Sequence, residues 1–316
     1  MKIVILDGKT TNPGDISWAP IEALGETTVY DGTPPELVIE RAKDAEALII
    51  NRINLTREVL SQLPKLRFIG MLATGYNSVD TVAARERGID LCNVPDYCAD
   101  TVAQQALTLL LALCGSVHLH TELIQDGQWD KAVEMNHTTH PLYELSGKTL
   151  GIVGYGAIGQ RVAKLGLDLG MKVLLSSRTE KAAPQGCTWT GLETLFEQSD
   201  VVSLHCPLNE HTQHLVNERL LSLMKPTALL INTSRGGVVD SAALAKALNE
   251  NRLLGAGIDV MEQEPPRADD PLLTAKNCMI TPHIAWASKE ARIRLVEAVA
   301  GNLRAFQNGA PINVVN

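Results

Sequence analysis

The 316-residue sequence lacks an excess of positive charge, a CxxC pair and a long hydrophobic run. Its 28 lysines and arginines against 36 aspartates and glutamates give a formal net charge of −8, which disfavours nucleic acid as a general partner. The six cysteines indicate reduced thiols in a cytoplasmic protein. The most apolar stretch, residues 106–117, is far shorter than the roughly 20 residues of a membrane-spanning helix.

Two further patterns are missing. The first ten residues, MKIVILDGKT, hold too short an apolar segment for a secretory signal and instead indicate a buried strand. No set of histidine, cysteine and carboxylate residues has the spacing of a metal site, so we expect no bound metal.

Short apolar runs alternate with segments of helical periodicity along nearly the whole chain. Such alternation is typical of parallel sheets that are covered by helices on both faces. We expect strands at 3–6, 47–50, 68–72, 149–154, 172–177, 200–207, 228–234 and 255–261. We expect helices at 34–45, 77–88, 99–120, 158–170, 241–253 and 288–307, with Asp240 as an N-cap and Gly88 as a stop.

The two long helical segments, 99–120 and 288–307, bracket the second series of strands. This order predicts a discontinuous arrangement of two domains, which also agrees with the chain length. Residues 1–98 and 287–316 would form one domain, and residues 99–286 would form the other.

A glycine-rich motif, GYGAIG at 154–159, follows an expected strand and opens an expected helix. In this context Gly154 permits a tight turn, Gly156 admits a pyrophosphate and Gly159 lets the helix pack closely on the strand. The N–H groups of the helix N-terminus would bind the phosphates. The motif therefore predicts a dinucleotide site.

The end of the next strand, at Ser177, bears on the choice of dinucleotide. An acidic residue there would accept a hydrogen bond from the ribose 2′-hydroxyl of NAD, but this chain has serine followed by Arg178 and Thr179. Arg178 and the nearby Lys181 favour NADP, or tolerance of it, whereas Glu180 favours NAD.

Three ionisable residues stand in loops after expected strands: Arg235 in NTSRGGVVD, Glu264 in GIDVMEQEPP and His283 in TPHIAWAS. Ligands of open parallel sheets bind outside the carboxyl ends of the strands, so these side chains are expected at one edge.

Seven segments together resemble the D-isomer-specific 2-hydroxyacid dehydrogenase family. They are LATGYNSVD (72–80), NVPDYCADTVAQ (93–104), LSGKTLGIVGYGAIG (145–159), HCPLNEHT (205–212), INTSRGGVVD (231–240), GIDVMEQEP (257–265) and TPHIAWAS (281–288). Within the family, NPGD near the start, VAQ at 102–104 and PHIAW are most similar to glycerate dehydrogenases, also called hydroxypyruvate reductases. The resemblance implies a Rossmann dinucleotide-binding domain inserted in a flavodoxin-like substrate domain.

The resemblance assigns catalytic roles to Arg235, Glu264 and His283. Arg235 would bind the substrate carboxylate through charge-assisted hydrogen bonds. His283 would act as general acid in reduction and as general base in oxidation. Glu264 would orient the imidazole and favour its protonated form.

The resemblance also implies binding residues. Those for the cofactor are Gly154, Tyr155, Gly156, Ala157, Ile158, Gly159, Ser177, Arg178, Thr179, His205, Cys206, Pro207, Thr212, Thr233, Ser234, Arg235, Asp259 and His283. Those for the substrate are Arg52, Ala73, Thr74, Gly75, Arg235, His283 and Trp286.

The expected function is interconversion of hydroxypyruvate or glyoxylate with D-glycerate or glycolate, using NADP or NAD. A lactate-type or other D-2-hydroxyacid dehydrogenase is one alternative, and a non-enzymatic dinucleotide-sensing protein similar to the family's corepressors is another. We expect a small 2-oxo or 2-hydroxy acid as substrate and neither nucleic acid nor membrane as a partner. The resemblance further implies a homodimer.

Overall fold

The computed structural model describes residues 1–127, 129, 142–180 and 182–316. The chain divides into two compact units. The first unit combines Met1–Cys98 with Trp286–Asn316, and the second unit is Ala99–Ala285. Trp286 falls in the first unit, one residue earlier than the boundary expected from the sequence.

The described part of the first unit contains a five-stranded parallel sheet in the order β2-β1-β3-β4-β5. The strands are β1 (Lys2–Ile5), β2 (Glu26–Val29), β3 (Ala47–Ile50), β4 (Phe68–Met71) and β5 (Asp90–Cys92). This 2-1-3-4-5 order is the flavodoxin-like one. The helices are α1 (Ala19–Glu22), α2 (Val38–Ala42), α3 (Arg57–Ser61), α4 (Thr81–Glu86) and α12 (Lys289–Gln307).

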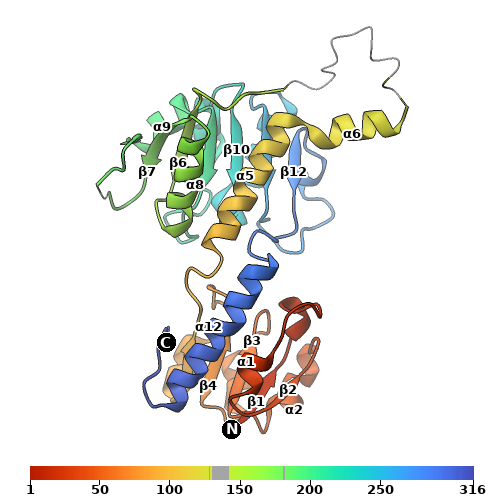
Figure 1. Cartoon of the computed structure of the whole chain (residues 1–316), viewed down its shortest axis with the longest axis vertical. Coiled ribbons are helices and arrows are strands. Elements are labelled where there is room, and N and C mark those ends of the chain that lie inside the picture. Colours follow the sequence, from red (N-terminus) through yellow and green to blue (C-terminus); the bar gives the residue numbers. More distant parts are fainter. Residues whose placement is uncertain (128, 130–141, 181) are drawn as a thin grey trace. The chain divides into compact units, whose positions relative to one another are not determined.

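Alternation along the strands gives the first unit a core on each face of its sheet. Val4 of β1 belongs to a cluster with Leu60 of α3. The preceding residue, Ile3, belongs to a different cluster with Ile21 of α1 and Leu295 of α12. Figure 1 shows α12 running along the sheet near β4.

The described part of the second unit contains a seven-stranded parallel sheet in the order β12-β11-β10-β9-β6-β7-β8. The strands are β6 (Thr149–Val153), β7 (Lys172–Ser176), β8 (Cys187–Trp189), β9 (Val201–Leu204), β10 (Leu229–Asn232), β11 (Gly255–Ile258) and β12 (Cys278–Ile280). Numbered within this unit, the order is 7-6-5-4-1-2-3, which is the Rossmann arrangement.

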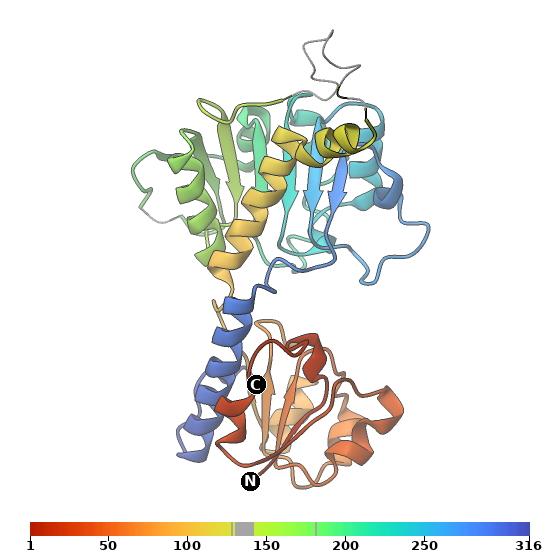
Figure 2. The ribbon, with the colours of Figure 1, turned by 45° about the vertical axis from the view of Figure 1, so that its right-hand side comes forward.

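Helices cover both faces of the second sheet. Two of them, α5 (Ala99–Gly115) and α8 (Ala157–Asp168), share one core and lie side by side across the sheet in Figure 2. The other face is covered by α9 (Leu192–Gln198), α10 (Glu218–Leu223) and α11 (Ser241–Asn249). The strand order reverses between β6 and β9, and this is where a doubly wound sheet opens its ligand crevice.

Local signals predict several helix ends correctly. The carboxylate of Asp240 accepts a hydrogen bond from the backbone N–H of Ala243 at 3.0 Å, which confirms the predicted N-cap of α11. Gly88, with φ of +66°, lies just beyond α4.

Lys181 and most of the polar, irregular segment 128–144 lie outside the described residues.

The prediction of a single helix over 99–120 is wrong. The helix α5 ends at Gly115, and a second helix, α6 (Val117–Gln125), starts after Ser116, whose φ is +44°. Among the described residues, no single helix has the length and apolar character to span a membrane. The pair α5 and α6 meets that test only jointly, by length and composition, across a bend of 53°.

Candidate active site

Most of the expected site residues of the second unit follow the carboxyl ends of β6, β7, β9, β10, β11 and β12. The glycine loop joins β6 to α8 beside the reversal of strand order. Gly154 has a φ of +94°, and a Cβ atom there would lie 2.7 Å from the backbone nitrogen of Cys206. A Cβ atom on Gly159 would lie 2.1 Å from the carbonyl oxygen of Gly154. Both glycines are therefore required by the protein's own packing.

Gly156 differs from these two glycines. A Cβ atom built there would meet none of the described protein atoms within 4 Å, so internal packing does not require a glycine. Gly156 is the N-cap of α8 and makes no side-chain cap, which leaves N–H groups at the helix N-terminus for an external acceptor. An open backbone at the N-terminus of a 12-residue helix fits a dinucleotide pyrophosphate.

The remaining residues of the motif support the loop. The ring of Tyr155 packs edge-on against Trp189, with 5.5 Å between ring centroids. Ala157 is the first residue of α8, and Ile158 packs against the core beneath it.

The three residues directly after β7, Ser177 to Thr179, include a cation and no acid, and Glu180 follows them. Ser177 is half-buried, whereas Arg178 and Thr179 are exposed. No ion pair joins Arg178 to another residue in the described part of the chain. Lys181, which the sequence places nearby, lies outside that part.

The loop after β9 begins with His205, which is half-buried. His205 Nε2 lies 2.9 Å from the hydroxyl of Ser203, and its buried Nδ1 atom has no hydrogen-bond partner among the described residues. Burial lowers the pKa of His205 to about 3, so the imidazole is neutral in the folded protein. Burial also raises the pKa of the adjacent Cys206 thiol to about 11.

A turn of the same loop is closed by Thr212. Its hydroxyl donates to the carbonyl of Pro207 at 2.6 Å and accepts from the backbone N–H of Asn209 at 2.8 Å. Thr212 therefore fixes the course of the chain from Pro207 onwards.

Arg235 lies in the turn that follows β10. Its guanidinium is exposed and donates through Nη1 to the carbonyl of Ser234 at 2.7 Å. Ser234 in turn donates to the side chain of Asn232. The hydroxyl of Thr233 is buried and has no partner among the described residues.

The turn that carries Arg235 packs directly on the turn that carries Glu264. A Cβ atom on Gly236 would lie 2.0 Å from the carbonyl carbon of Met261. Only glycine allows the two backbones to approach this closely. Met261 also donates its N–H to Glu264 Oε1 at 3.1 Å. Met261 therefore links the turn of Arg235 to the carboxylate of Glu264.

His283 and Glu264 form a hydrogen-bonded pair. The distance from His283 Nδ1 to Glu264 Oε2 is 2.6 Å, and the two side chains are 32% and 34% exposed. A carboxylate only accepts, so Nδ1 carries the shared proton and Nε2 is the remaining nitrogen. The structure therefore brings together two of the three residues expected to be catalytic, on loops that follow β11 and β12.

The side chain of Asp259 holds the loop that carries His283. Its side chain is buried and accepts from the hydroxyl of Thr281 at 2.5 Å and from the N–H groups of Ile284 and Ala285 at 3.0 and 2.9 Å. His283 has a left-handed φ of +54°, and its N–H donates to the carbonyl of Asp259 at 2.7 Å. The carboxylate thus organises the turn that presents the imidazole.

Arg52 belongs to the first unit and follows β3. Its backbone N–H and that of Asn51 donate to the buried carboxylate of Asp7, at 2.6 and 2.9 Å. Burial raises the pKa of Asp7, although these hydrogen bonds oppose the shift.

The expected carboxylate loop, residues 73–75, follows β4 and is tied to the segment after β5. Ala73 accepts from the N–H of Val94 at 3.0 Å, and the hydroxyl of Thr74 donates to the carbonyl of Val94 at 2.8 Å. The backbone N–H groups of Thr74 and Gly75 donate no hydrogen bond to any of the described residues.

Trp286 packs against the core that α12 forms with the sheet of the first unit.

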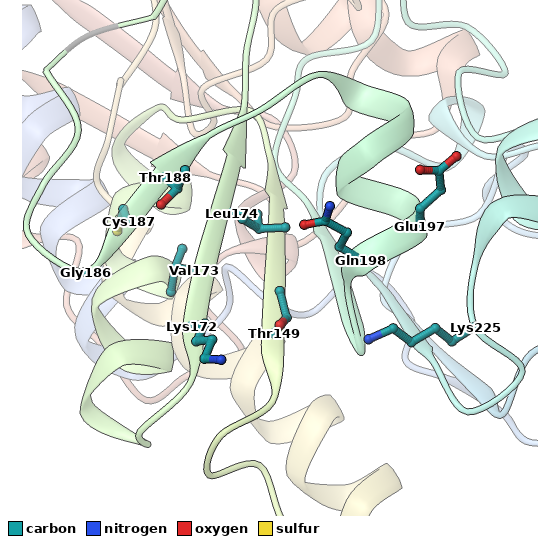
Figure 3. A pocket seen from close by; sticks show the side chains of 10 residues that line it. All are labelled: Thr149, Lys172, Val173, Leu174, Gly186, Cys187, Thr188, Glu197, Gln198 and Lys225. Carbon is teal, nitrogen blue, oxygen red and sulfur yellow. The ribbon is translucent and has the colours of Figure 1, made fainter.

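A depression of about 680 Å³ lies elsewhere in the second unit (Figure 3). Thr149, Lys172 and Cys187 line it, and they are the first residues of β6, β7 and β8. The depression therefore lies at the strand ends opposite the glycine loop. Its Lys225 already pairs with Asp200 at 2.8 Å.

Sequence patterns do not identify the buried polar residues that hold these loops. The expected strands 3–6 and 228–234 put Asp7 just after one strand and Asn232 inside the other, and the patterns give neither side chain a role. The available signal is a polar residue directly after, or at the end of, an otherwise apolar strand.

Among the described residues no group of three or more potential ligands could hold a metal ion, and His137 and His140 lie outside them.

Comparison with known proteins identifies close relatives. Residues 107–285 match the family model described as D-isomer specific 2-hydroxyacid dehydrogenase, NAD binding domain. The chain is 44% identical to a hydroxypyruvate reductase of Blautia hydrogenotrophica, and the alignment covers 100% of both chains. It is 39% identical to a glycerate dehydrogenase of Methylorubrum extorquens, with 99% and 98% covered. It is 43% identical to a glyoxylate reductase of Korarchaeum cryptofilum, with 90% and 88% covered.

Solved structures share the fold along the whole chain. The TT0316 protein of Thermus thermophilus gives a TM-score of 0.88 at 35% identity. An acyclic imino acid reductase in complex with NADPH and D-Arg gives 0.86 at 31%, and a D-lactate dehydrogenase of Aquifex aeolicus complexed with NAD and lactic acid gives 0.82 at 28%. Each of these alignments covers 100% of both chains. The comparisons confirm the resemblance and the α/β fold.

The lowered pKa of His205 predicts a contribution of this residue to the acid sensitivity of the folded protein. The unfolded chain binds a proton at this residue below pH 6.5, whereas the folded protein does so only below about pH 3. Stability therefore falls as pH decreases between these values, by up to about 1.4 kcal/mol per pH unit from this group. Urea unfolding of wild type and His205→Gln at several pH values measures the effect. The stability difference between them should shift in favour of the variant on acidification.

The exposed His211 provides the matched control for that experiment. His211→Gln should follow the wild-type pH dependence. Parallel pH profiles for His205→Gln and wild type would contradict the lowered pKa of His205 in the folded protein.

Proposed function

Because the chain belongs to the D-isomer specific 2-hydroxyacid dehydrogenase family, we propose that it reduces hydroxypyruvate or glyoxylate to D-glycerate or glycolate. The reductant is NADPH or NADH. The observation that carries the proposal is the 2.6 Å bond between His283 and Glu264, on loops at the carboxyl edge of an NAD-binding sheet. A histidine held by a carboxylate suits proton transfer near neutral pH.

The proposed chemistry divides between a hydride and a proton. When bound, the reduced nicotinamide supplies a hydride for the carbonyl carbon of the 2-oxo acid. The carbonyl oxygen becomes an alkoxide, and His283 donates a proton to it from Nε2. Glu264 holds Nδ1–H and so fixes both the tautomer and the plane of the ring. In the oxidative direction, His283 accepts the same proton.

Arg235 supplies the charge that recognises the acid. Its exposed guanidinium binds the substrate carboxylate through charge-assisted hydrogen bonds and polarises the neighbouring carbonyl. Within the first unit, the backbone N–H groups of Thr74 and Gly75 also suit hydrogen bonds to a carboxylate. Arg52 is assigned to the polar end of the substrate.

Turnover assays test the proposal directly. Loss of reduced-cofactor absorbance should be fast with hydroxypyruvate or glyoxylate and slow with pyruvate or 2-oxoglutarate. A preference for pyruvate would indicate a lactate-type dehydrogenase instead. Tight cofactor binding without turnover of any of the four acids would favour the dinucleotide-sensing alternative.

His283→Gln should lower kcat by about 10²- to 10⁴-fold, because the alkoxide loses its proton donor. Binding of the reduced cofactor, followed by its fluorescence, should be retained. The matched control is His214→Gln, since His214 Nε2 pairs with Glu262 at 2.7 Å in nearby loops. Wild-type turnover in His283→Gln, or equal losses in both variants, would contradict the assignment.

We propose that Ser177 and Arg178 make NADPH acceptable or preferred, because no acid stands there to bind a ribose 2′-hydroxyl. Arg178→Ala should raise the KM for NADPH about tenfold and leave the KM for NADH nearly unchanged. Ser177→Asp should shift the preference towards NADH. Arg219→Ala, which removes an exposed arginine of the same unit, is the control. Equal changes for both cofactors would contradict a contact with the 2′-phosphate.

We also propose a homodimer, in which α5 and α6 contribute to the interface. No residue of α6 is buried, and Leu111, Val117 and Ile124 are exposed hydrophobic side chains on these two helices. Sedimentation equilibrium at micromolar concentration should give the mass of two chains, and Val117→Lys should weaken association. A single-chain mass for the wild type would contradict the proposal.

A further inference from the structure

We propose that Asn232 is a positioning residue for the reaction and acts through Arg235. Asn232 is the last residue of β10, and only 1% of its surface is exposed. This inference rests on the proposed function, which assigns Arg235 to the substrate carboxylate. It concerns how the direction of that guanidinium is set.

The side chain of Asn232 spans the turn that it precedes. Its Oδ1 atom accepts from the N–H of Ser234 at 3.0 Å and from the Ser234 hydroxyl at 2.9 Å. Its Nδ2 atom donates to the backbone carbonyl of Arg235 at 3.0 Å. One buried amide thus binds backbone groups on both sides of the peptide unit that joins Ser234 to Arg235.

The guanidinium is the next link in this chain of hydrogen bonds. Arg235 Nη1 donates to the carbonyl of Ser234 at 2.7 Å, and Ser234 is the residue whose N–H and hydroxyl Asn232 holds. In the described part of the chain no carboxylate forms an ion pair with Arg235. The guanidinium is therefore anchored to a carbonyl whose position depends on Asn232.

The other side of the turn is already fixed. Gly236 lies against the backbone of Met261 so closely that a Cβ atom would be 2.0 Å away. Asn232 and Gly236 therefore hold the turn from its two ends, and Arg235 lies between them. Loss of Asn232 leaves the Gly236 contact in place and releases the end that orients Arg235.

The chemistry of the amide explains why asparagine suits this position. Aspartate would keep the acceptor for Ser234 but would lose the donor to the carbonyl of Arg235 and add a negative charge that faces this carbonyl. Alanine would leave the N–H of Ser234 and the carbonyl of Arg235 without these partners.

The experiment compares Asn232→Ala and Asn232→Asp with wild type, using hydroxypyruvate and the better of the two reduced cofactors. Misorientation of Arg235 should lower kcat/KM for the 2-oxo acid on the order of 10- to 100-fold. The dissociation constant of the reduced cofactor, measured by its fluorescence, should stay within about twofold of wild type. A comparable loss of cofactor binding would overturn the proposal, because it would show a general disturbance of the unit.

A double-mutant cycle separates positioning from a merely structural role. In the Arg235→Ala background, Asn232→Ala should cause no further loss of kcat/KM, since the group through which it acts is absent. A further loss as large as in the wild-type background would overturn the proposal.

The matched control is Asn217→Ala. Like Asn232, Asn217 makes three side-chain hydrogen bonds, in its case all to backbone groups, at the start of α10, and the proposed function gives it no role. It should lower stability and leave kcat/KM for hydroxypyruvate near wild type. If Asn232→Ala does not fold, Ser234→Ala removes the hydroxyl bond to Asn232. Because Ser234 is itself an expected cofactor residue, the dissociation constant of the reduced cofactor is measured for this variant too. Ser234→Ala should give a smaller loss, about threefold, that also disappears in the Arg235→Ala background.

The same set of variants tells the two proposals apart. If Arg235→Ala retains wild-type kinetics, the carboxylate role of Arg235 and the positioning role of Asn232 are both overturned. If Arg235→Ala loses activity but the Asn232 variants do not, only the positioning role is overturned.

Discussion

The geometry of the candidate active site depends on the buried carboxylate of Asp259. The side chain of Asp259 is almost fully buried, and three donors from residues 281–285 bind its two oxygens. These donors bend the chain after β12 so tightly that His283 adopts a left-handed backbone, a conformation that costs a residue other than glycine on the order of 1 kcal/mol or more. The hydrogen bonds to Asp259 hold the turn in this conformation. The imidazole of His283 therefore stays where Glu264 can bind it.

The same physical solution recurs in both sheets. Asp7 after β1, Asn232 at the end of β10 and Asp259 after β11 are all buried polar side chains at the carboxyl end of a strand. Each one hydrogen-bonds to backbone groups of a loop. The residue that holds the loop and the residue proposed to act on the ligand are therefore different. A loop supported in this way loses little conformational entropy when a ligand arrives, because its ordering was completed on folding.

Sequence patterns predict the parts of the fold that depend on short-range signals. The buried strands Ala47–Ile50 and Leu229–Asn232 are apolar runs, and Asp240 is a local cap. The strands that these patterns miss, such as β2 and β8, are edge strands, and their half-exposed residues show no such run. The motifs locate the glycine loop and the His283 and Glu264 segments. They cannot show that Gly236 packs on Met261 or that Asp259 binds the 281–285 turn, because these contacts join loops that are distant in sequence.

The discontinuity of the first unit has a consequence for the order of events during synthesis. Its sheet is complete at β5, yet one of its two cores needs Leu295, Val299 and Leu303 of α12, and Val314 pairs with Cys92 in an isolated bridge. A ribosome makes those residues only after all of Ala99–Ala285. The second unit is one continuous stretch, so it can fold first while the nascent first unit still exposes the apolar face of its sheet. During that interval, the face that α12 later covers is the part of the chain that a chaperone would have to protect.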